Sequence, residues 1–265
     1  MLALIKEFRD VLKWHELLWQ MVGREVKTRY KQSVLGYFWV LLNPTAQMLV
    51  MSFAFSIIMR IPTNAAGNVP YSIFLFVALL PWNLFANSLS SASASLVSSS
   101  SLITKVYFPR SILVIATILA KIVDFLFANI VLIIYMIAYR MPININILWV
   151  IPIFFIQQIF TTGLALFFAA SNLIYRDIQY LLSLGLLLWM YLTPVIYPAS
   201  LTGIYSWFLA MNPMTGVIKA ARSALFADFP MNWLQLGISG LACLFILLIG
   251  LYYFQKTEKY FADIV

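Results

Sequence analysis

Long apolar runs constrain this chain more than any other feature of its sequence. Of its 265 residues, 63% are hydrophobic and only 10% are charged, whereas soluble domains are about 45–50% apolar and about 25% charged. A helix that crosses the hydrocarbon core of a bilayer needs about 20 mostly apolar residues. The composition therefore excludes a soluble enzyme and predicts an all-α membrane protein.

Six apolar runs, bounded by charges or by Pro, Gly and Asn, are long enough to be membrane spans. They cover residues 36–59, 71–97, 112–139, 147–172, 178–198 and 233–254. We expect one transmembrane domain over residues 1–265. It consists of a cytoplasmic segment at 1–35, a six-span bundle at 36–254 and a cytoplasmic tail at 255–265.

The segment before the first span has the periodicity of an amphipathic helix and no visible signal peptide. Its apolar residues recur at helical steps, namely Leu4, Ile5, Phe8, Val11, Leu12, Leu18 and Val22. We expect this helix to lie in the bilayer interface, because the first span follows directly. A soluble amphipathic helix that packs on a partner would have the same pattern.

The distribution of basic residues predicts that both termini are cytoplasmic. In that orientation twelve Lys and Arg residues lie in inside segments and four, namely Arg60, Arg140, Lys219 and Arg222, lie in outside segments. Basic residues favour the cytoplasmic side of membrane proteins. The net charge of +8 is therefore explained by topology, and no dense basic stripe predicts nucleic-acid binding.

The sequence lacks the motifs of soluble chemistry. None of its ten glycines is followed by lysine, so no G-x-x-x-x-G-K-[ST] phosphate cradle is present. There is no H-E-x-x-H or G-x-S-x-G motif, and the single cysteine, Cys243, can form neither an intrachain disulfide nor a cysteine metal cluster. We expect no catalytic residue, no metal and no ATPase in this chain, which indicates a channel, a transporter or a part of one.

Two ionisable residues, Lys121 and Asp124, lie one helical turn apart inside the third expected span. Charges in lipid are costly and are usually paired or functional. Residues at this spacing can pair with each other on one helix face. A structural pair is the favoured interpretation, with a proton-coupling or a lining role as alternatives.

Polar residues also form stripes on the first two spans. Trp39, Asn43 and Gln47 follow one another at four-residue steps around Pro44, and Asn83 and Asn87 repeat the spacing. Such a stripe cannot comfortably face lipid. It either hydrogen-bonds to neighbouring spans or lines a path for something polar and large.

The outward stretch 199–232 is too long for a hairpin and too apolar for an idle loop. Asn212 and Pro213 have the pattern of an N-cap followed by the first helical position. We therefore expect two short outer helices. In the second, an apolar face opposes Lys219 and Arg222 and consists of Ile218, Ala221 and Leu225. A gate over a pathway and a plain amphipathic lid are equally supported, and Trp207 belongs to the same stretch.

Several motifs resemble the membrane subunits of ATP-binding-cassette polysaccharide exporters, above all the O-antigen exporter permeases, with wall teichoic acid permeases as near relatives. They are YKQSVLGYFWVLLNP from Tyr30, LITKVYFPR from Leu102, NLIYRDIQYLL from Asn172, LTPVIYP from Leu192 and NPM from Asn212. Their order and spacing run nearly end to end and are more specific than any one motif alone.

The resemblance implies a homodimer with the path along its axis, and one ATPase subunit docked on each copy. ATP and Mg²⁺ would bind to that partner. The loop 98–110 would form a coupling helix between spans two and three, with Ser98, Leu102, Lys105, Tyr107 and Arg110 at the ATPase. The leader helix would be a second contact, through Glu16, Arg24, Lys27 and Arg29.

The function that this resemblance implies is export of a lipid-linked polysaccharide from the cytoplasm across a bacterial inner membrane. A small-molecule or drug exporter of related build is the alternative within transport, and a polytopic membrane transferase is the alternative from another class. Our candidates for stacking on passing sugars are Trp39, Trp82, Trp189 and Tyr191, chosen because aromatic faces pack on sugar rings.

Overall fold

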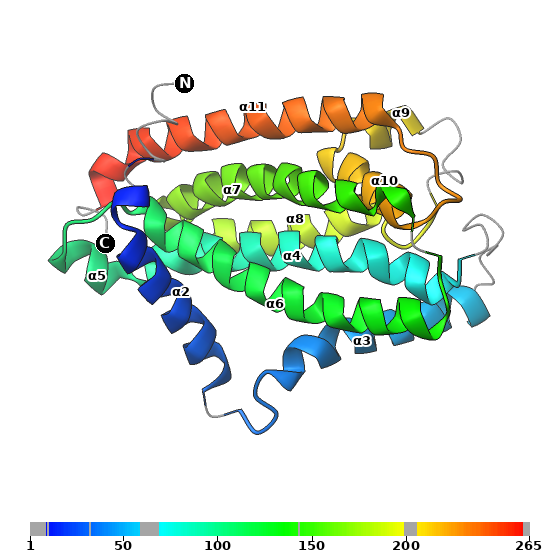
Figure 1. Cartoon of the computed structure of the whole chain (residues 1–265). Helices are drawn as coiled ribbons and strands as arrows, with labels where there is room; N and C mark the ends of the chain where they lie inside the picture. Colours follow the sequence, from blue (N-terminus) through cyan, green and yellow to red (C-terminus); the bar gives the residue numbers. More distant parts are fainter. Residues whose placement is uncertain are drawn as a thin grey trace.

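The computed structural model describes residue 9 and residues 11–31, 33–58, 69–142, 144–198 and 206–261. These residues form helices joined by short connections and contain no β-strand (Figure 1). The α-helices are α2 (His15–Tyr30), α3 (Phe38–Ser52), α4 (Tyr71–Ser98), α5 (Ser100–Lys105), α6 (Ser111–Ala138), α7 (Val150–Ile174), α8 (Ile178–Leu192), α9 (Ser206–Ala210), α10 (Pro213–Leu225) and α11 (Trp233–Thr257). A π-helical segment, Phe53–Ile58, extends α3, and 3-10 turns at Ile145–Trp149 and Glu258–Tyr260 flank α7 and α11.

Helix α4 is the centre of the bundle. It packs against α3, α6, α7, α8 and α10, and most of its side chains are buried. Pro81 interrupts its hydrogen-bond ladder, and next to this break Gln157 Nε2 of α7 donates to the Pro81 carbonyl at 2.7 Å. A polar side chain thus fixes α7 against the central helix.

Helices α7 and α11 cross at two glycines. A Cβ atom on Gly163 would lie 2.6 Å from the Cα of Leu247, and a Cβ atom on Gly250 would overlap the Gly163 carbonyl oxygen. Small residues allow this close approach of backbones where lipid gives no hydrophobic drive for helix association.

The bundle has two distinct ends. Helix α2 begins and α11 ends beside α5, at the end that we call the α5 end, whereas α9 and α10 lie toward the opposite end, the α10 end (Figure 1). The backbone N–H of Arg110, which follows α5, donates to Glu258 Oε1 after α11 at 3.1 Å. The start of α6 and the end of α11 are therefore tied together.

Five helical segments are long and apolar enough to cross a membrane. They are Phe38–Ser56, Tyr71–Ser98, Ser111–Ala138, Ile145–Ile174 and Trp233–Tyr260. The expected span at 178–198 differs, because α8 has only 15 residues and rises about 22 Å, short of a hydrocarbon core of about 30 Å. From Thr193 to Pro198 the chain is not helical.

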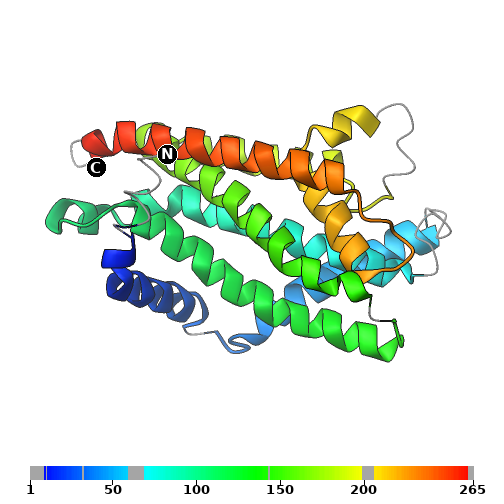
Figure 2. The same ribbon diagram turned by 45° about the horizontal axis from the view of Figure 1, so that its top comes forward.

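The leader helix packs on the protein itself. Leu18, Met21 and Val22 of α2 are buried in the core, and α2 lies beside the half of α6 nearer α5 (Figures 1 and 2). Of the apolar stripe that suggested an interfacial helix, Leu18 and Val22 are therefore covered by protein, whereas Leu12 is 55% exposed. The position of this helix in the bilayer interface stays a prediction.

Parts of the expected elements lie outside the described residues. They are residues 1–8 of the leader, Arg60 after the first span, residues 199–205 of the outer stretch and residues 262–265 of the tail.

Candidate functional site

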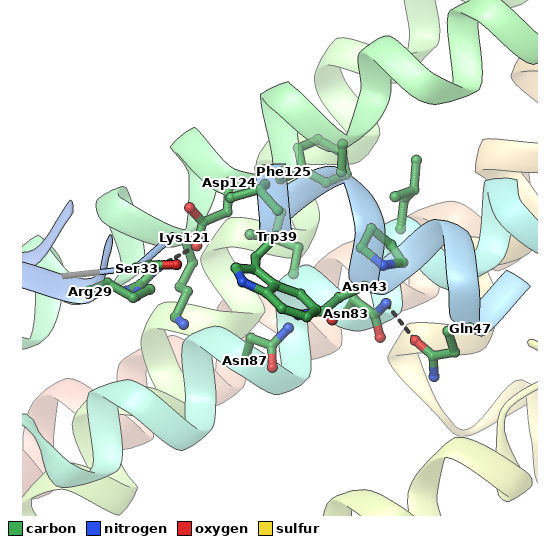
Figure 3. A pocket seen from close by; sticks show the side chains of 15 residues that line it. Arg29, Ser33, Trp39, Asn43, Gln47, Asn83, Asn87, Lys121, Asp124 and Phe125 are labelled. Carbon is green, nitrogen blue, oxygen red and sulfur yellow. Dashed lines mark hydrogen bonds and ion pairs between the residues drawn. The ribbon is translucent and has the colours of Figure 1, made fainter. Parts of the chain in front are cut away.

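A polar cavity lies among the end of α2, α3, α4 and α6 (Figure 3). We call it the α3–α4 cavity, and its volume is about 670 Å³. Its polar and aromatic lining consists of Arg29, Ser33, Trp39, Asn43, Gln47, Asn83, Asn87, Lys121, Asp124 and Phe125. Polar groups inside a membrane bundle are costly unless they are partnered or face water or a polar ligand. This cavity is therefore the leading candidate for a functional site.

The two polar stripes expected from the sequence face each other across this cavity. Trp39, Asn43 and Gln47 come from successive turns of α3, and Asn83 and Asn87 come from α4 (Figure 3). Asn83 Nδ2 donates to Gln47 Oε1 at 3.0 Å. The four-residue spacing places each set on one helix face, and the packing of α3 on α4 joins the two sets.

The charged residues of the cavity are paired differently from the expectation. Asp124 forms a hydrogen-bonded ion pair with Arg29 at the end of α2, so the expected pair between Lys121 and Asp124 is corrected. Lys121 lies one turn away on α6 and points into the same cavity (Figure 3). Sequence reasoning had assigned Arg29 to a contact with the ATPase. The fold places it in the lining of this cavity.

Only one of the four proposed sugar-stacking aromatics lines the cavity. Trp39 is 42% exposed there, whereas Trp82 is 3% exposed in the core and its ring packs on Phe85. A buried Trp82 cannot touch a passing glycan, so that candidate is corrected. Trp189 packs edge-on against Phe85 and Phe160, and Tyr191 is exposed on α8.

The α5 end presents a short helix and an exposed aromatic residue. Ile103 anchors α5 in the core and Leu102 packs partly against it, while Lys105 and Tyr107 are exposed, Tyr107 to 85%. Ser98 Oγ donates to the Ser95 carbonyl at 3.1 Å and closes the end of α4. Lys105 and Tyr107 are therefore accessible for contact with another protein, as are Glu16, Arg24 and Lys27 on the exposed side of α2.

Arg110 has a partner within the chain. Besides the backbone bond to Glu258, its Nη1 lies 3.8 Å from Glu258 Oε1, and the side chain is largely covered. The structure thus shows Arg110 holding the start of α6 to the end of α11, a role that local sequence reasoning missed because its partner is 148 residues away.

At the α10 end, Arg222 is buried rather than on a polar outer face. It is 3% exposed, and it donates to the carbonyls of Pro194 and Val195 at 2.7 Å each and of Phe74 at 3.4 Å. Its guanidinium carbon lies 3.5 Å from the centre of the Phe74 ring, a favourable cation–π distance. The expectation that Arg222 opposes the apolar face of this helix is corrected.

The start of α10 matches the expected N-cap. Asn212 Oδ1 accepts the backbone N–H of Met214 at 3.0 Å, and Pro213 is the first helical residue. Asn212 Nδ2 also donates to Thr193 Oγ1 at 2.8 Å.

Two other residues of the outer stretch have different surroundings. Trp207 of α9 is exposed. Lys219 of α10 is partly buried, and this burial lowers the pKa of its ammonium group.

The described chain has apolar helices long enough to span a membrane, and several of them surround a polar and charged cavity. This combination is typical of a polytopic membrane protein of the permease type. A model of the ABC-2 type transporter family matches residues 16–226. The chain therefore belongs to the ABC-2 type transporter family, which confirms the resemblance seen in its motifs.

Similar proteins are named for the export of O-antigen or for the transport of polysialic acid. The O-antigen export system permease protein RfbA of Klebsiella pneumoniae is 32% identical over 253 residues, which cover 94% of this chain and 95% of the relative. RfbA of Myxococcus xanthus is 32% identical over 227 residues, covering 84% and 85%. The polysialic acid transport protein KpsM of Escherichia coli is more distant, with 24% identity over 243 residues covering 89% and 91%.

Proposed function

We propose that this chain is the membrane subunit of an ATP-driven exporter that moves a lipid-linked polysaccharide of the O-antigen type from the cytoplasm across the inner membrane. The observation that carries this proposal is the α3–α4 cavity, a polar and charged space inside an apolar bundle. The likeness to RfbA permeases over nearly the whole chain supports the choice of substrate class.

ATP is proposed to act from outside this chain. The sequence has no phosphate cradle, so a separate nucleotide-binding subunit would bind ATP and Mg²⁺. The exposed Lys105 and Tyr107 beside α5 and the exposed side of α2 are suitable contact surfaces for it. Because α5 is anchored through buried Ile103, a push on this helix would be passed to α4 and α6.

Six crossings with both termini cytoplasmic fit the geometry, with α8 as the short crossing. At its start, Gln179 is hydrogen-bonded to Ser93 near the α5 end of α4. After its end, Arg222 and Tyr71 bind the segment 194–196 near the other end of α4. The interval from Tyr71 to Ser93 corresponds to about 33 Å of helix, enough to cross the hydrocarbon core.

A homodimer with the transport path along its axis completes the proposal. In the single chain, α3 and α8 leave large apolar side chains exposed, such as Leu49, Val50, Leu187 and Leu188. A second copy and lipid would cover these faces. Two copies of the permease would then bind two ATPase subunits.

Co-purification tests this function. The tagged full-length chain is extracted in detergent from its own host, and its partners and their ATPase activity are measured. We expect a nucleotide-binding protein to co-purify, and we expect deletion of the permease to trap lipid-linked glycan in the cytoplasmic leaflet. Reconstituted export without any nucleotide hydrolase would refute the proposal, as would unchanged surface glycan combined with altered drug sensitivity.

A further inference from the structure

We infer that the α3–α4 cavity binds the phosphate-bearing head group of a lipid, with Lys121 as its principal cationic contact. The inference rests on the proposed function, because it assigns a place in the bundle to the charged group of a lipid-linked substrate.

The need for such a site follows from the physics of the bilayer. An isolated ionised group costs tens of kcal/mol to transfer into a medium of low dielectric, so a protein that moves a phosphate across a membrane must supply charge and donors within the span. Lys121 is the eleventh residue of α6 and lies about 15 Å from the start of that helix. Its ammonium is therefore well inside the spanning segment.

The charges around the cavity leave Lys121 available for an anion. The lining contains two cations and one carboxylate, and Arg29 is paired with Asp124. Within the described part of the chain, Lys121 takes part in neither of the two ion pairs. Arg29, Asp124 and Glu25 all act on Lys121 electrostatically. The charge of Asp124 is shared with Arg29, and Glu25 of α2 is not among the residues that line the cavity.

Neutral donors complete an oxyanion site. Asn43 and Asn87 are exposed and line the cavity, with Asn87 on the side of Lys121 and Asn43 beyond the Trp39 ring (Figure 3). Each amide offers two N–H donors. The hydroxyl of Ser33, whose oxygen accepts the backbone N–H of Gly36 at 3.2 Å, adds another possible donor. A volume of about 670 Å³ is within the usual range of ligand pockets, about 300–1,000 Å³.

Apolar side chains beside the cavity favour a lipid over a free phosphate. Val34 and Leu35 in the connection to α3 are exposed directly after Ser33, Phe38 at the start of α3 is exposed next to Trp39, and the exposed Phe127 on α6 packs near Tyr37. A hydrocarbon tail can lie against these residues while the head group occupies the polar cavity. This combination suits an amphiphile.

The test measures binding to the full-length chain in phosphatidylcholine nanodiscs, without ATPase or nucleotide. The probe is farnesyl pyrophosphate, with farnesol and inorganic pyrophosphate as comparison ligands. We expect saturable binding of farnesyl pyrophosphate that Lys121→Met weakens by about tenfold or more, since hydrogen bonds to charged groups contribute about 1.5–3 kcal/mol. Lys121→Arg keeps the charge and should keep most of the affinity, and Lys219→Met on α10 should leave it unchanged.

Several outcomes would overturn the inference. Equal affinity of wild type and Lys121→Met, with Lys121→Arg folded and also unchanged, would remove Lys121 from the site. Equal binding of inorganic pyrophosphate would assign the cavity to free phosphate, and loss of the signal in phosphatidylglycerol nanodiscs would assign it to ordinary anionic phospholipid. Displacement of the probe by undecaprenyl pyrophosphate would support a lipid-linked substrate.

The binding test is separable from the test of function. If Lys121-dependent binding persists but no nucleotide-binding partner co-purifies, the proposed function fails and the site stands. If a partner co-purifies and drives export while farnesyl pyrophosphate binds independently of Lys121, the site fails and the function stands.

Discussion

A single guanidinium holds three elements together at the α10 end. Arg222 of α10 donates to the carbonyls of Pro194 and Val195 after α8 and of Phe74 in α4. The residues after α8 are not helical, so their carbonyls need partners that the backbone does not supply. Arg222 therefore stabilises the irregular end of α8 and positions α10 over it.

Replacing Arg222 should destabilise the protein strongly. Arg222→Met keeps much of the side-chain bulk but leaves the Pro194 and Val195 carbonyls without this donor, which should cost about 2–5 kcal/mol in the free energy of unfolding. The check is thermal unfolding of the purified chain in detergent.

Lys219→Met is the matched control for this residue, because Lys219 lies on the same helix and has a single long contact, 3.3 Å from Nζ to Gln235 Oε1. It should change the free energy of unfolding by no more than about 1 kcal/mol. Equal effects of the two substitutions would show that Arg222 is not the tie between α8 and α10.

At this scale, the sequence predicts what depends on local spacing. The i, i+4 steps of Trp39, Asn43 and Gln47 correctly indicate a shared face, and Asn212 before Pro213 correctly indicates a helix start. The partners of Arg29 and Arg222 could not be predicted, because they lie 95 and 27 to 148 residues away. Such contacts depend on how the helices pack, which helical periodicity does not specify.

Close helix contact at glycine is the clearest packing feature at the scale of elements. The crossing of α7 and α11 brings Gly163 against Gly250 and Leu247. Both neighbours of an added methyl group would be backbone atoms, which cannot rotate out of the way. The distance between the two helices therefore depends on the absence of side chains at these positions.

Gly250→Ala should push α11 away from α7. The added Cβ would overlap the Gly163 carbonyl, and overpacking of this kind costs about 1–3 kcal/mol. Thermal unfolding in detergent measures the loss. Gly237→Ala on the same helix meets nothing within 4 Å and should leave the stability unchanged or raise it, since alanine favours helix by about 1 kcal/mol. Equal melting temperatures for the two variants would contradict the close crossing.

The end of α5 and the connection after it offer two basic residues with different expected roles, Lys105 and Arg110. Lys105→Glu should leave the melting temperature unchanged, because Lys105 is exposed, and should reduce co-purification of the ATPase subunit. Arg110→Glu should place a second carboxylate beside that of Glu258 and lower the free energy of unfolding by about 1 kcal/mol. The effect is small because the pair is partly solvated. The melting temperature and the yield of ATPase separate the two effects.

Glu258→Lys in the Arg110→Glu background is the control for this pair. Restoring opposite charges should recover part of the lost stability, although the carboxylate that accepts the Arg110 backbone N–H stays absent. The assignment of Arg110 to an internal tie would be wrong if Arg110→Glu kept full stability and lost only the partner.

Helix lengths and faces were less predictable than helix positions. An apolar run at 178–198 looks like a full span, yet α8 ends at Leu192 because Pro194 and Pro198 cannot continue it and Arg222 supplies alternative hydrogen bonds. The apolar stripe of α2 was predictable, but whether it meets α6 or lipid was not. Hydrophobicity alone does not distinguish a protein neighbour from a hydrocarbon one.

Over the whole molecule, the two ends of the bundle constrain the membrane topology. The described chain starts and finishes at the α5 end (Figure 1). If that end lies on one side of the membrane, as in the proposed topology, the number of crossings is even. Five helical segments are long enough to span a membrane by length and composition. In the proposed topology, α8 with the non-helical residues up to Pro198 makes the sixth crossing.

Site-directed labelling tests this topology directly. In a Cys243→Ala background, Arg176→Cys marks the turn between α7 and α8, and Met211→Cys marks the connection between α9 and α10; both residues are exposed. If α8 crosses, a membrane-impermeant maleimide applied to sealed, inside-out vesicles should label Arg176→Cys and spare Met211→Cys, and right-side-out spheroplasts should give the reverse. Permeabilised membranes control for reactivity, because both positions should then be labelled. Labelling of both positions from one side would mean that α8 is re-entrant, and the two termini would then lie on opposite sides of the membrane.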